Sequence, residues 1–216
     1  MSRLIVLVHT VPPLIAEFSR LCAELLPEAV VKHILDEPLL ERVHRRGRLA
    51  PEDTHRLEGH VRMAEELGAA AVLVTCSTVS PCVDEIRTRT RVPVIKIDEP
   101  MLAEAVRLGT RIGVVATNPT TLEPTRTSLL AAASACRRAV DIDLLLVEGA
   151  LPALLRGDGE THDRLVAEAV RALAGRVDVV ILAQASMARV LRVLPQGPVP
   201  VLSSPHLALA QIRGMK

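Results

Sequence analysis

The sequence repeats itself with a period of half its length. The segment Arg3–Val8 recurs as Arg111–Ala116, an offset of 108 residues. The apolar segment that ends at Cys76 recurs as one that ends at Gln184, again with an offset of 108. Because the chain has 216 residues, this repeat predicts two halves of equal size that are related by a pseudo-twofold axis.

Each half alternates short β-branched runs with longer stretches of helical period, which is typical of a parallel sheet covered by helices. The expected strands are Leu4–Val8, Val30–Leu35, Ala71–Val74, Val94–Ile97, Ile112–Ala116, Ile142–Val147, Val179–Ala183 and Val199–Leu202. The expected helices are Pro13–Leu25, Pro51–Leu67, Ser80–Arg87, Met101–Leu108, Leu122–Cys136, Thr161–Ala174 and Met187–Leu194.

These elements predict an α/β fold of two pseudo-symmetric, Rossmann-like (flavodoxin-like) parallel-sheet halves. We place the halves at residues 1–100 and 101–216, and the final segment 199–216 is a candidate to pack back on the first half. Ligands of such sheets bind beyond the carboxyl ends of the strands. The expected active site therefore lies in a cleft between the two halves.

Charge and composition narrow the possible partners. Lys and Arg total 26 and Asp and Glu total 25, so the net charge of +1 provides no broad basic field for nucleic acid or an anionic membrane. The single aromatic residue, Phe18, cannot build a stacking platform for bases. No apolar run resembles a signal peptide or reaches the length of a membrane span, so we expect a cytoplasmic protein.

The sequence indicates no metal and no cofactor. Its four cysteines lack CxxC spacing, so neither a disulfide framework nor a thiolate zinc site is expected. His55 and His60 do not have the i, i+4 spacing of a helical metal site. The glycines are isolated and form no phosphate-binding loop, so a nucleotide cofactor is not expected either.

The strand that ends at Val74 is followed by a cysteine, several hydroxyl groups and a proline, in the segment Thr75–Pro81. Pro81 suits the first turn of a helix, and free N–H groups near a helix N-terminus favour a thiolate over a thiol. Cys76 is therefore a candidate nucleophile or proton-abstracting base. The alternative is a small buried cysteine that only fills the core.

The second half has polar residues at two corresponding strand ends. The turn Thr117–Thr121 offers hydroxyls, an amide and unpaired N–H groups that could receive a carboxylate, and its alternative interpretation is a simple capping turn. The segment Gln184-Ala185-Ser186 occupies the repeat position of the cysteine segment. An amide such as Gln184 can bind a ligand but cannot transfer protons near neutral pH.

Three segments give the chain a family resemblance: Val72–Thr78, Arg111–Thr121 and Val180–Ala188. Across nearly its whole length the chain resembles the cofactor-independent aspartate/glutamate/hydantoin racemases. In that family two pseudo-symmetric domains each present one cysteine to a cleft, and the two thiols remove and return the proton beside a carboxylate. The resemblance places Cys76 at the first of these cysteines. The residues it implies for substrate binding are Ser77 and Thr78, with Thr117, Thr120 and Thr121 as contacts to the carboxylate and Asn118 in the same turn.

The chain departs from the family pattern in two places. Hydantoin-type members have a Gly-Cys-Ala-Gly-Met-Ala-like segment where this chain has Ala183–Ala188, so Gln184 replaces the second cysteine and Ala185 follows it. Ser186 is a weak substitute, because an unactivated hydroxyl titrates far above neutral pH. His9 and Thr10 stand where relatives often carry acidic or amide residues, and His9 could bind substrate or orient or deprotonate the thiol.

We therefore expect a cofactor-independent isomerase, of the racemase or epimerase type, that acts beside the carboxylate of a small amino acid or derivative. His162, after a loop in the second half, is a candidate for the missing proton donor, and its alternative role is a surface helix cap beside a salt-bridging aspartate, Asp163. The main alternative function is one-cysteine chemistry, either cis–trans isomerisation or decarboxylation of a small dicarboxylate. The second alternative is a non-catalytic carboxylate-binding protein. The expected assembly is a homodimer or a higher homo-oligomer.

Overall fold

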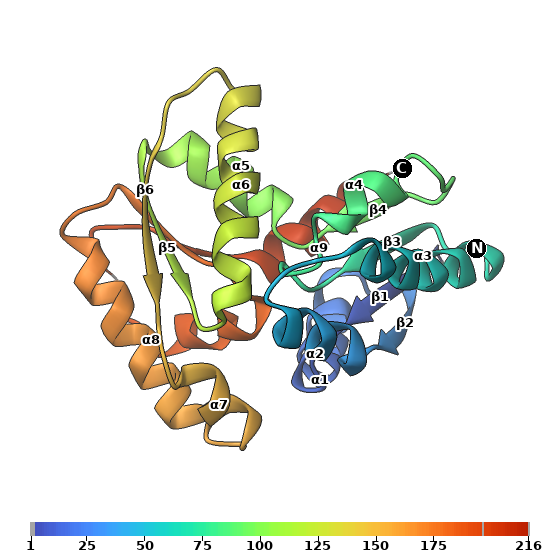
Figure 1. The fold of residues 1–216 in the computed structure, drawn as a ribbon, viewed down its shortest axis with the longest axis horizontal. Coiled ribbons are helices and arrows are strands. Elements are labelled where there is room, and N and C mark those ends of the chain that lie inside the picture. The colour runs from blue at the N-terminus through green and yellow to red at the C-terminus, as the bar shows by residue number, and fades with distance from the viewer. Residues whose placement is uncertain (1–2, 196, 216) are drawn as a thin grey trace. The chain divides into compact units, whose positions relative to one another are not determined.

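The computed structural model describes residues 3–195 and 197–215, which divide into two compact units. One unit contains the residues up to Asp98 together with those from Pro205 onward, and the other is Glu99–Ser204. Each unit has its own four-stranded parallel sheet with helices packed on it (Figure 1). The prediction of an α/β fold built from two parallel-sheet halves is confirmed.

The sheet of the first unit has the strand order β2-β1-β3-β4. Its strands are β1 (Arg3–His9), β2 (Ala29–Leu35), β3 (Ala71–Val74) and β4 (Val94–Lys96). The helices are α1 (Pro13–Leu25), α2 (Glu37–Arg46), α3 (Pro51–Glu66), α4 (Cys82–Ile86) and α9 (Ser204–Gly214). Every residue of β3 is buried, as expected for a central strand that helices cover on both faces.

The second unit repeats this topology, with the strand order β6-β5-β7-β8. Its strands are β5 (Arg111–Ala116), β6 (Asp141–Leu146), β7 (Val179–Leu182) and β8 (Val201–Ser203). The helices are α5 (Glu99–Leu108), α6 (Pro119–Ala135), α7 (Ala150–Leu155), α8 (Gly159–Ala174) and the 3-10 helix η1 (Ala185–Arg192). The two halves of the sequence repeat thus fold into sheets of equivalent order, with β3 and β7 at the same place in each.

Three helices were absent from the sequence prediction: α2, α7 and α9. Helix α2 has the clearest local cause, because the side chain of Asp36 accepts a hydrogen bond from the backbone of Leu39 and so caps its first turn. The helix ends at Gly47, whose φ of 74° gives a left-handed cap that favours glycine. The segment expected as a helix from Met187 is the 3-10 helix η1.

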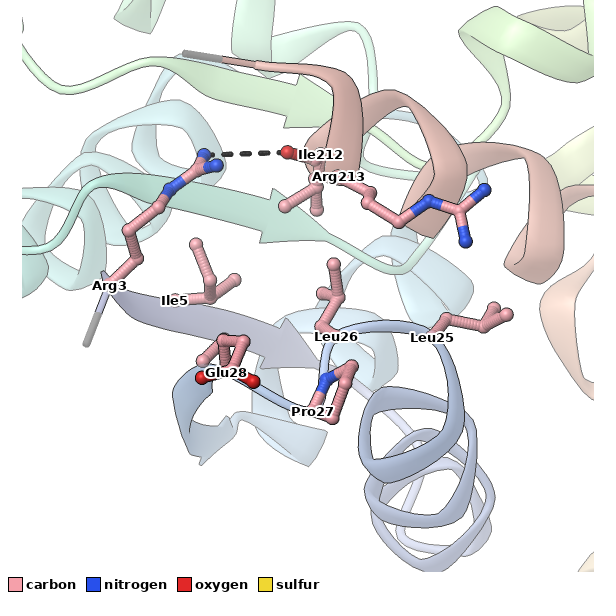
Figure 2. Close-up of a pocket in the computed structure, with 9 residues that line it drawn as sticks. Arg3, Ile5, Leu25, Leu26, Pro27, Glu28, Ile212 and Arg213 are labelled. Atoms are coloured by element: carbon pink, nitrogen blue, oxygen red, sulfur yellow. Dashed lines mark hydrogen bonds between the residues drawn. The ribbon is translucent and has the colours of Figure 1, made fainter.

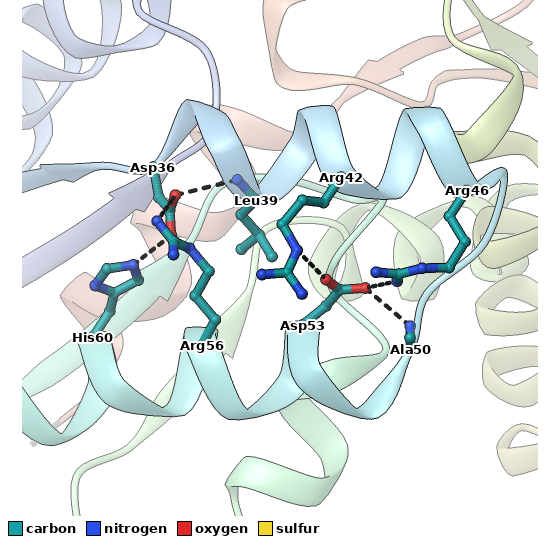
Figure 3. A network of polar contacts seen from close by, with 8 residues as sticks. All are labelled: Asp36, Leu39, Arg42, Arg46, Ala50, Asp53, Arg56 and His60. Atoms are coloured by element: carbon teal, nitrogen blue, oxygen red, sulfur yellow. Dashed lines mark hydrogen bonds and ion pairs between the residues drawn. The ribbon is translucent and has the colours of Figure 1, made fainter.

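Two buried carboxylates join α2 to α3 (Figure 3). The carboxylate of Asp36 accepts two hydrogen bonds from the guanidinium of Arg56, at 2.7 and 2.8 Å, and lies 2.6 Å from Nε2 of His60. Burial pushes the pKa of Asp36 upward, but hydrogen bonds from Arg56 and His60 outweigh it and hold the pKa below its ordinary value. Asp53 is fully buried, and its partners are Arg46 at 2.6 Å and the N–H of Ala50 at 2.9 Å.

The C-terminal helix α9 is bound to the start of β1. The guanidinium of Arg3 donates to the carbonyl oxygens of Met215 at 2.6 Å and Ile212 at 3.3 Å. Beside this contact is a cavity of about 620 Å³, lined mainly by apolar residues from β1, α9 and the loop that precedes β2 (Figure 2). It lies at the amino ends of the strands, the end of the sheet remote from the polar strand ends described below. Among the described residues, no helix is both long and apolar enough to cross a membrane.

Candidate functional site

Cys76 lies directly beyond the carboxyl end of β3, in a buried polar segment. The residues on either side of it, Thr75 and Ser77, are also buried. Its carbonyl oxygen accepts the N–H groups of Val79 at 3.2 Å and Ser80 at 3.1 Å, which closes a turn before α4 begins. The helix expected from Ser80 therefore starts only at Cys82, and the turn, not a helix N-terminus, surrounds the thiol.

The environment of the thiol differs from the sequence expectation. Burial raises the pKa of Cys76, whereas the Thr10 hydroxyl and the backbone N–H groups of Val79 and Thr78 lower it. Burial outweighs these hydrogen-bonding groups, so the pKa lies above its ordinary value and the resting group is a thiol. The expectation of a favoured thiolate is wrong for this state, because desolvation of the charge dominates.

Two buried hydroxyl groups lie beside this strand end. Thr10 follows β1 and Ser77 follows β3, and these two strands are neighbours in the sheet. Both residues are at most 3% exposed; the Thr10 hydroxyl faces the Cys76 thiol, whereas the Ser77 hydroxyl has no hydrogen-bond partner in the described part of the chain. Because buried hydroxyls are normally paired, the Ser77 hydroxyl indicates a place for a ligand or water.

His9 is buried and both of its ring nitrogens are already bonded. Nδ1 lies 2.8 Å from the hydroxyl of Thr75, which itself donates to the carbonyl of Val8, so Nδ1 must be the donor. Nε2 then accepts from Nδ1 of His33 at 2.9 Å. Burial, with a smaller contribution from His33, lowers the pKa of His9 to about 3. His9 is thus a neutral ring bonded to Thr75 and His33, with no nitrogen left to deprotonate Cys76.

In the second unit, Gln184 occupies the strand end that corresponds to Cys76. Its Oε1 accepts the backbone N–H of Thr117 at 2.7 Å, and its Nε2 donates to the Thr117 hydroxyl at 3.0 Å. Both groups that we expected Thr117 to offer a carboxylate are therefore bonded within the protein. Ala185 is buried in the first turn of η1, and Ser186 beside it is partly exposed.

The rest of the turn after β5 caps helix α6. Asn118 is the N-cap residue, and its Oδ1 accepts the N–H of Thr120 at 3.1 Å and the Thr120 hydroxyl at 2.9 Å. The N–H of Thr121 donates to the carbonyl of Asn118 at 3.0 Å. The capping role that we considered is present, and it uses N–H groups that an anion site needs.

His162 lies in the first turn of α8 and is fully buried. The cap of this helix is Asp158, so the expected alternative of a surface cap at His162 is wrong. Its Nδ1 is 2.8 Å from Asp163, which also binds Arg189 at 2.9 Å. The sequence predicts a salt-bridging aspartate beside His162, and Asp163 does form ion pairs. Nothing in the sequence links Arg189 to it.

The two strand ends differ in the chemistry they offer. The first presents a thiol, two turn N–H groups, the Thr10 hydroxyl and the unpartnered hydroxyl of Ser77. The second presents a neutral amide–hydroxyl pair and a histidine–aspartate pair. Within residues 3–195 and 197–215, no three His, Cys, Asp or Glu side chains gather as a metal site would require.

Comparison with known proteins gives a consistent result. The family model described as Asp/Glu/Hydantoin racemase matches residues 10–212. Picrophilus torridus aspartate racemase has a TM-score of 0.74 at 11% identity, over 99% of this chain and 95% of that one. Glutamate racemase isoform RacE1 from Bacillus anthracis has a TM-score of 0.69 at 16% identity, over 97% of this chain and 80% of that one. Allantoin racemase from Klebsiella pneumoniae has a TM-score of 0.68 at 18% identity, over 98% of this chain and 86% of that one. A search of curated protein sequences gave no match.

Proposed function

The chain belongs to the Asp/Glu/hydantoin racemase family of isomerases, and from this premise we propose that it is a cofactor-independent isomerase of a small amino acid or derivative. The reaction takes place at the carbon beside the substrate carboxylate. The solved structures of similar fold are named as racemases of glutamate, aspartate and allantoin, which are all small polar molecules.

Cys76 is the proposed reactive group. The observation that supports it most is a buried thiol at a strand end, which backbone N–H groups and the Thr10 hydroxyl face, beside the buried and unpartnered hydroxyl of Ser77. As a thiol it donates a proton to the substrate carbon. As a thiolate, which the N–H groups of Thr78 and Val79 stabilise, it removes one or attacks as a nucleophile. The raised pKa makes proton donation the role of the resting group.

The substrate carboxylate is proposed to bind the hydroxyl and N–H groups at these strand ends. In the first unit these are Thr10, Ser77 and Thr78, with His9 holding the strand end in shape through Thr75. In the second unit they are Thr117, Thr120 and Thr121. Thr117 becomes available to a carboxylate only when Gln184 releases it. Breaking the two hydrogen bonds between Gln184 and Thr117 costs free energy, which weakens that contact.

A second reaction type is supported by Gln184. Because an amide does not transfer protons, the strand end that carries a thiol in the family has lost that function here. One-cysteine chemistry, either cis–trans isomerisation or decarboxylation of a small dicarboxylate, needs no second acid. If a second acid exists in this chain, His162 and Ser186 are the proposed residues.

Two further expectations remain proposals. We propose that the protein works in the cytoplasm and that two or more copies assemble. Light scattering of the purified chain measures its oligomeric state directly, and the mass of a monomer would contradict the proposed assembly.

Proton NMR in D2O tests the reaction. Wild type, Cys76→Ser and the control Cys136→Ser, which changes an exposed cysteine, are incubated with aspartate, glutamate, allantoin, hydantoins, maleate and substituted malonates. Deuterium uptake with inversion that Cys76→Ser abolishes supports the isomerase, acting beside the carboxylate for aspartate or glutamate and beside a ring carbonyl for allantoin or a hydantoin. Turnover of maleate or malonates supports the one-cysteine alternative. If no compound reacts, the proposal fails and the chain is better described as a carboxylate-binding protein.

A further inference from the structure

The cavity at the amino ends of the first sheet has an apolar inner wall (Figure 2). Ile5 of β1, Leu26 after α1 and Ile212 of α9 line it, and each is at most 8% exposed. In Figure 2 the side chains of Ile5 and Leu26 point toward α9. The volume of about 620 Å³ lies within the roughly 300–1,000 Å³ that small-molecule sites occupy. The wall therefore suits the apolar body of a small molecule.

Two segments far apart in the sequence form the sides of this cavity, the end of α9 and the loop that precedes β2. Helix α9 is anchored by Ala208, Leu209 and Ile212, which are fully buried and share one face of the helix. Arg3 fixes the end of the helix through its hydrogen bonds to the carbonyl oxygens of Ile212 and Met215. A molecule bound between the two sides would contact both α9 and the sheet.

The rim of the cavity carries three charged side chains: Arg3, Arg213 and Glu28. None of them forms an ion pair within the described part of the chain. The partners of Arg3 are uncharged carbonyl groups, and they leave it further N–H donors. Two guanidinium groups against one carboxylate make the rim positive. Since a guanidinium only donates hydrogen bonds and pairs well with carboxylates, this rim is complementary to an anion.

Two helices, α1 and α9, end beside the cavity, and carbonyl groups at a helix end disfavour an anion. Hydrogen bonds within the chain already engage several of these carbonyls. Those of Ile212 and Met215 accept from Arg3, and that of Leu26 accepts the N–H of Ala29 at 2.9 Å. The side chain of Arg213 has no such partner among the described residues, so its positive charge is available to a ligand.

We propose that this cavity binds a small amphipathic anion, a straight-chain carboxylate of medium length. The alkyl chain lies against Ile5, Leu26 and Ile212, and the carboxylate lies at the positive rim, beside Arg213. The site is at the opposite end of the sheet from Cys76, which follows the carboxyl end of β3. The inference therefore stands apart from the proposed isomerase reaction.

Calorimetric titration of the purified chain tests the proposal, with hexanoate, octanoate and decanoate as probes below their micelle concentrations. Octanol and octylamine vary the charge of the head group at constant chain length. The variants are Arg213→Gln, Glu28→Gln and Ala29→Phe, which places a ring among the residues that line the cavity. The control is Arg45→Gln, which removes an exposed arginine of α2 outside the cavity.

We expect the affinity for the carboxylate to rise about three- to fourfold with each methylene that the cavity buries. Octylamine and octanol should bind more weakly than octanoate. Arg213→Gln should weaken octanoate binding by about two- to fivefold, the contribution of an exposed ion pair, and Glu28→Gln should strengthen it by a similar factor. Ala29→Phe should remove binding, and Arg45→Gln should bind like wild type. If Ala29→Phe fails to fold, the two exposed-site variants, Arg213→Gln and Glu28→Gln, still decide the outcome.

NMR of protein labelled at isoleucine, leucine and valine methyl groups locates the bound probe. Octanoate should shift the signals of Ile5, Leu26 and Ile212. Shifts confined to Val74 and Val79, which flank the Cys76 segment, would mean that the carboxylate binds at the candidate functional site, and this would overturn the proposal.

Three other results would also overturn it. Equal affinity for octanoate, octanol and octylamine would show an apolar site without preference for an anion. Cavity signals that shift with protein concentration, but not with octanoate, would show that a second copy of the chain covers the cavity. Absence of binding of every probe to folded wild type would show that the cavity is not a ligand site. Because each measurement reports binding and not turnover, failure of the proposed isomerase function would leave this test unchanged.

Discussion

The side-chain amide of Gln184 makes two hydrogen bonds to Thr117, one to its backbone N–H at 2.7 Å and one to its hydroxyl at 3.0 Å. They join the carboxyl ends of β7 and β5, which are neighbouring strands of the second sheet. The residue that the family resemblance places at the second-cysteine position therefore holds a group expected to bind substrate. This relationship makes Gln184 a structural partner of Thr117.

Replacement of Gln184 tests this relationship. Gln184→Ala leaves the N–H of Thr117, which is 4% exposed, without its partner, so we expect a loss of about 1–3 kcal/mol in the free energy of unfolding. Thr117→Val removes only the hydroxyl contact and should cost less. Urea unfolding of both single variants and the double variant gives their coupling energy. Additive losses would contradict a direct interaction.

The same substitution, Gln184→Ala, should weaken the fold but strengthen substrate binding. If a carboxylate must displace the amide from Thr117, Gln184→Ala removes that competition and lowers KM for the substrate found in the NMR panel. A raised KM would mean that Gln184 itself contacts the substrate. Steady-state kinetics at constant temperature distinguishes the two.

The thiol of Cys76 should react slowly with alkylating agents. Its pKa is raised by burial and only the thiolate is reactive, whereas Cys136 is exposed. With iodoacetamide near pH 7 we expect Cys136 to be modified first, and modification of Cys76 to speed up as the pH rises. Peptide mass spectrometry over time measures both sites. Rapid modification of Cys76 at neutral pH would contradict the raised pKa.

His9 should make the protein less stable in mild acid. Its pKa falls to about 3 in the folded state, against about 6.5 in the unfolded chain, so the unfolded chain binds the proton first. Its contribution to stability is complete above about pH 6.5 and is lost as the pH falls toward 3. Urea midpoints between about pH 7 and 5 should therefore fall for wild type and fall less for His9→Gln. An equal fall in both would show that other groups are responsible.

The stabilisation that Asp36 provides through its contacts with α3 should be lost at a lower pH than that of His9. Because Arg56 and His60 hold its pKa below the ordinary value, its stabilisation is present above about pH 3.9 and is lost as the pH falls below it. Asp36→Asn keeps a cap acceptor for Leu39 but leaves Arg56 without its ion pair. We expect a loss of about 3–5 kcal/mol or somewhat less, since Arg56 is partly exposed and can be hydrated. Thermal unfolding of Asp36→Asn beside the exposed-site control Glu52→Gln measures it.

Periodicity and the repeat were sufficient to predict the sheets. All eight strands lie within a residue or two of their expected bounds, because short runs of apolar and β-branched residues favour strands. Helix α2 was missed because its sequence is highly charged, and its stability comes from the cap at Asp36 and from Arg56 on α3. Such contacts join residues 20 positions apart and leave no periodic signal.

For the candidate site, the sequence suggests which residues to consider but not their electrostatics. Strand-end position and family resemblance pointed to Cys76, Thr117 and Gln184. The same logic favoured a thiolate, and it could not include the desolvation that raises the pKa of the thiol. The bonds from His9 to His33 and from Asp163 to Arg189 depend on side-chain packing across elements, which a single sequence does not encode locally.

The most direct test of the account is the deuterium content at the carbon beside the carboxylate after incubation in D2O with wild type, Cys76→Ser and Cys136→Ser. We predict uptake with inversion for wild type and Cys136→Ser, and none above background for Cys76→Ser at an unchanged thermal unfolding midpoint. Uptake by folded Cys76→Ser at the wild-type rate would contradict the central claim that this thiol carries the proton.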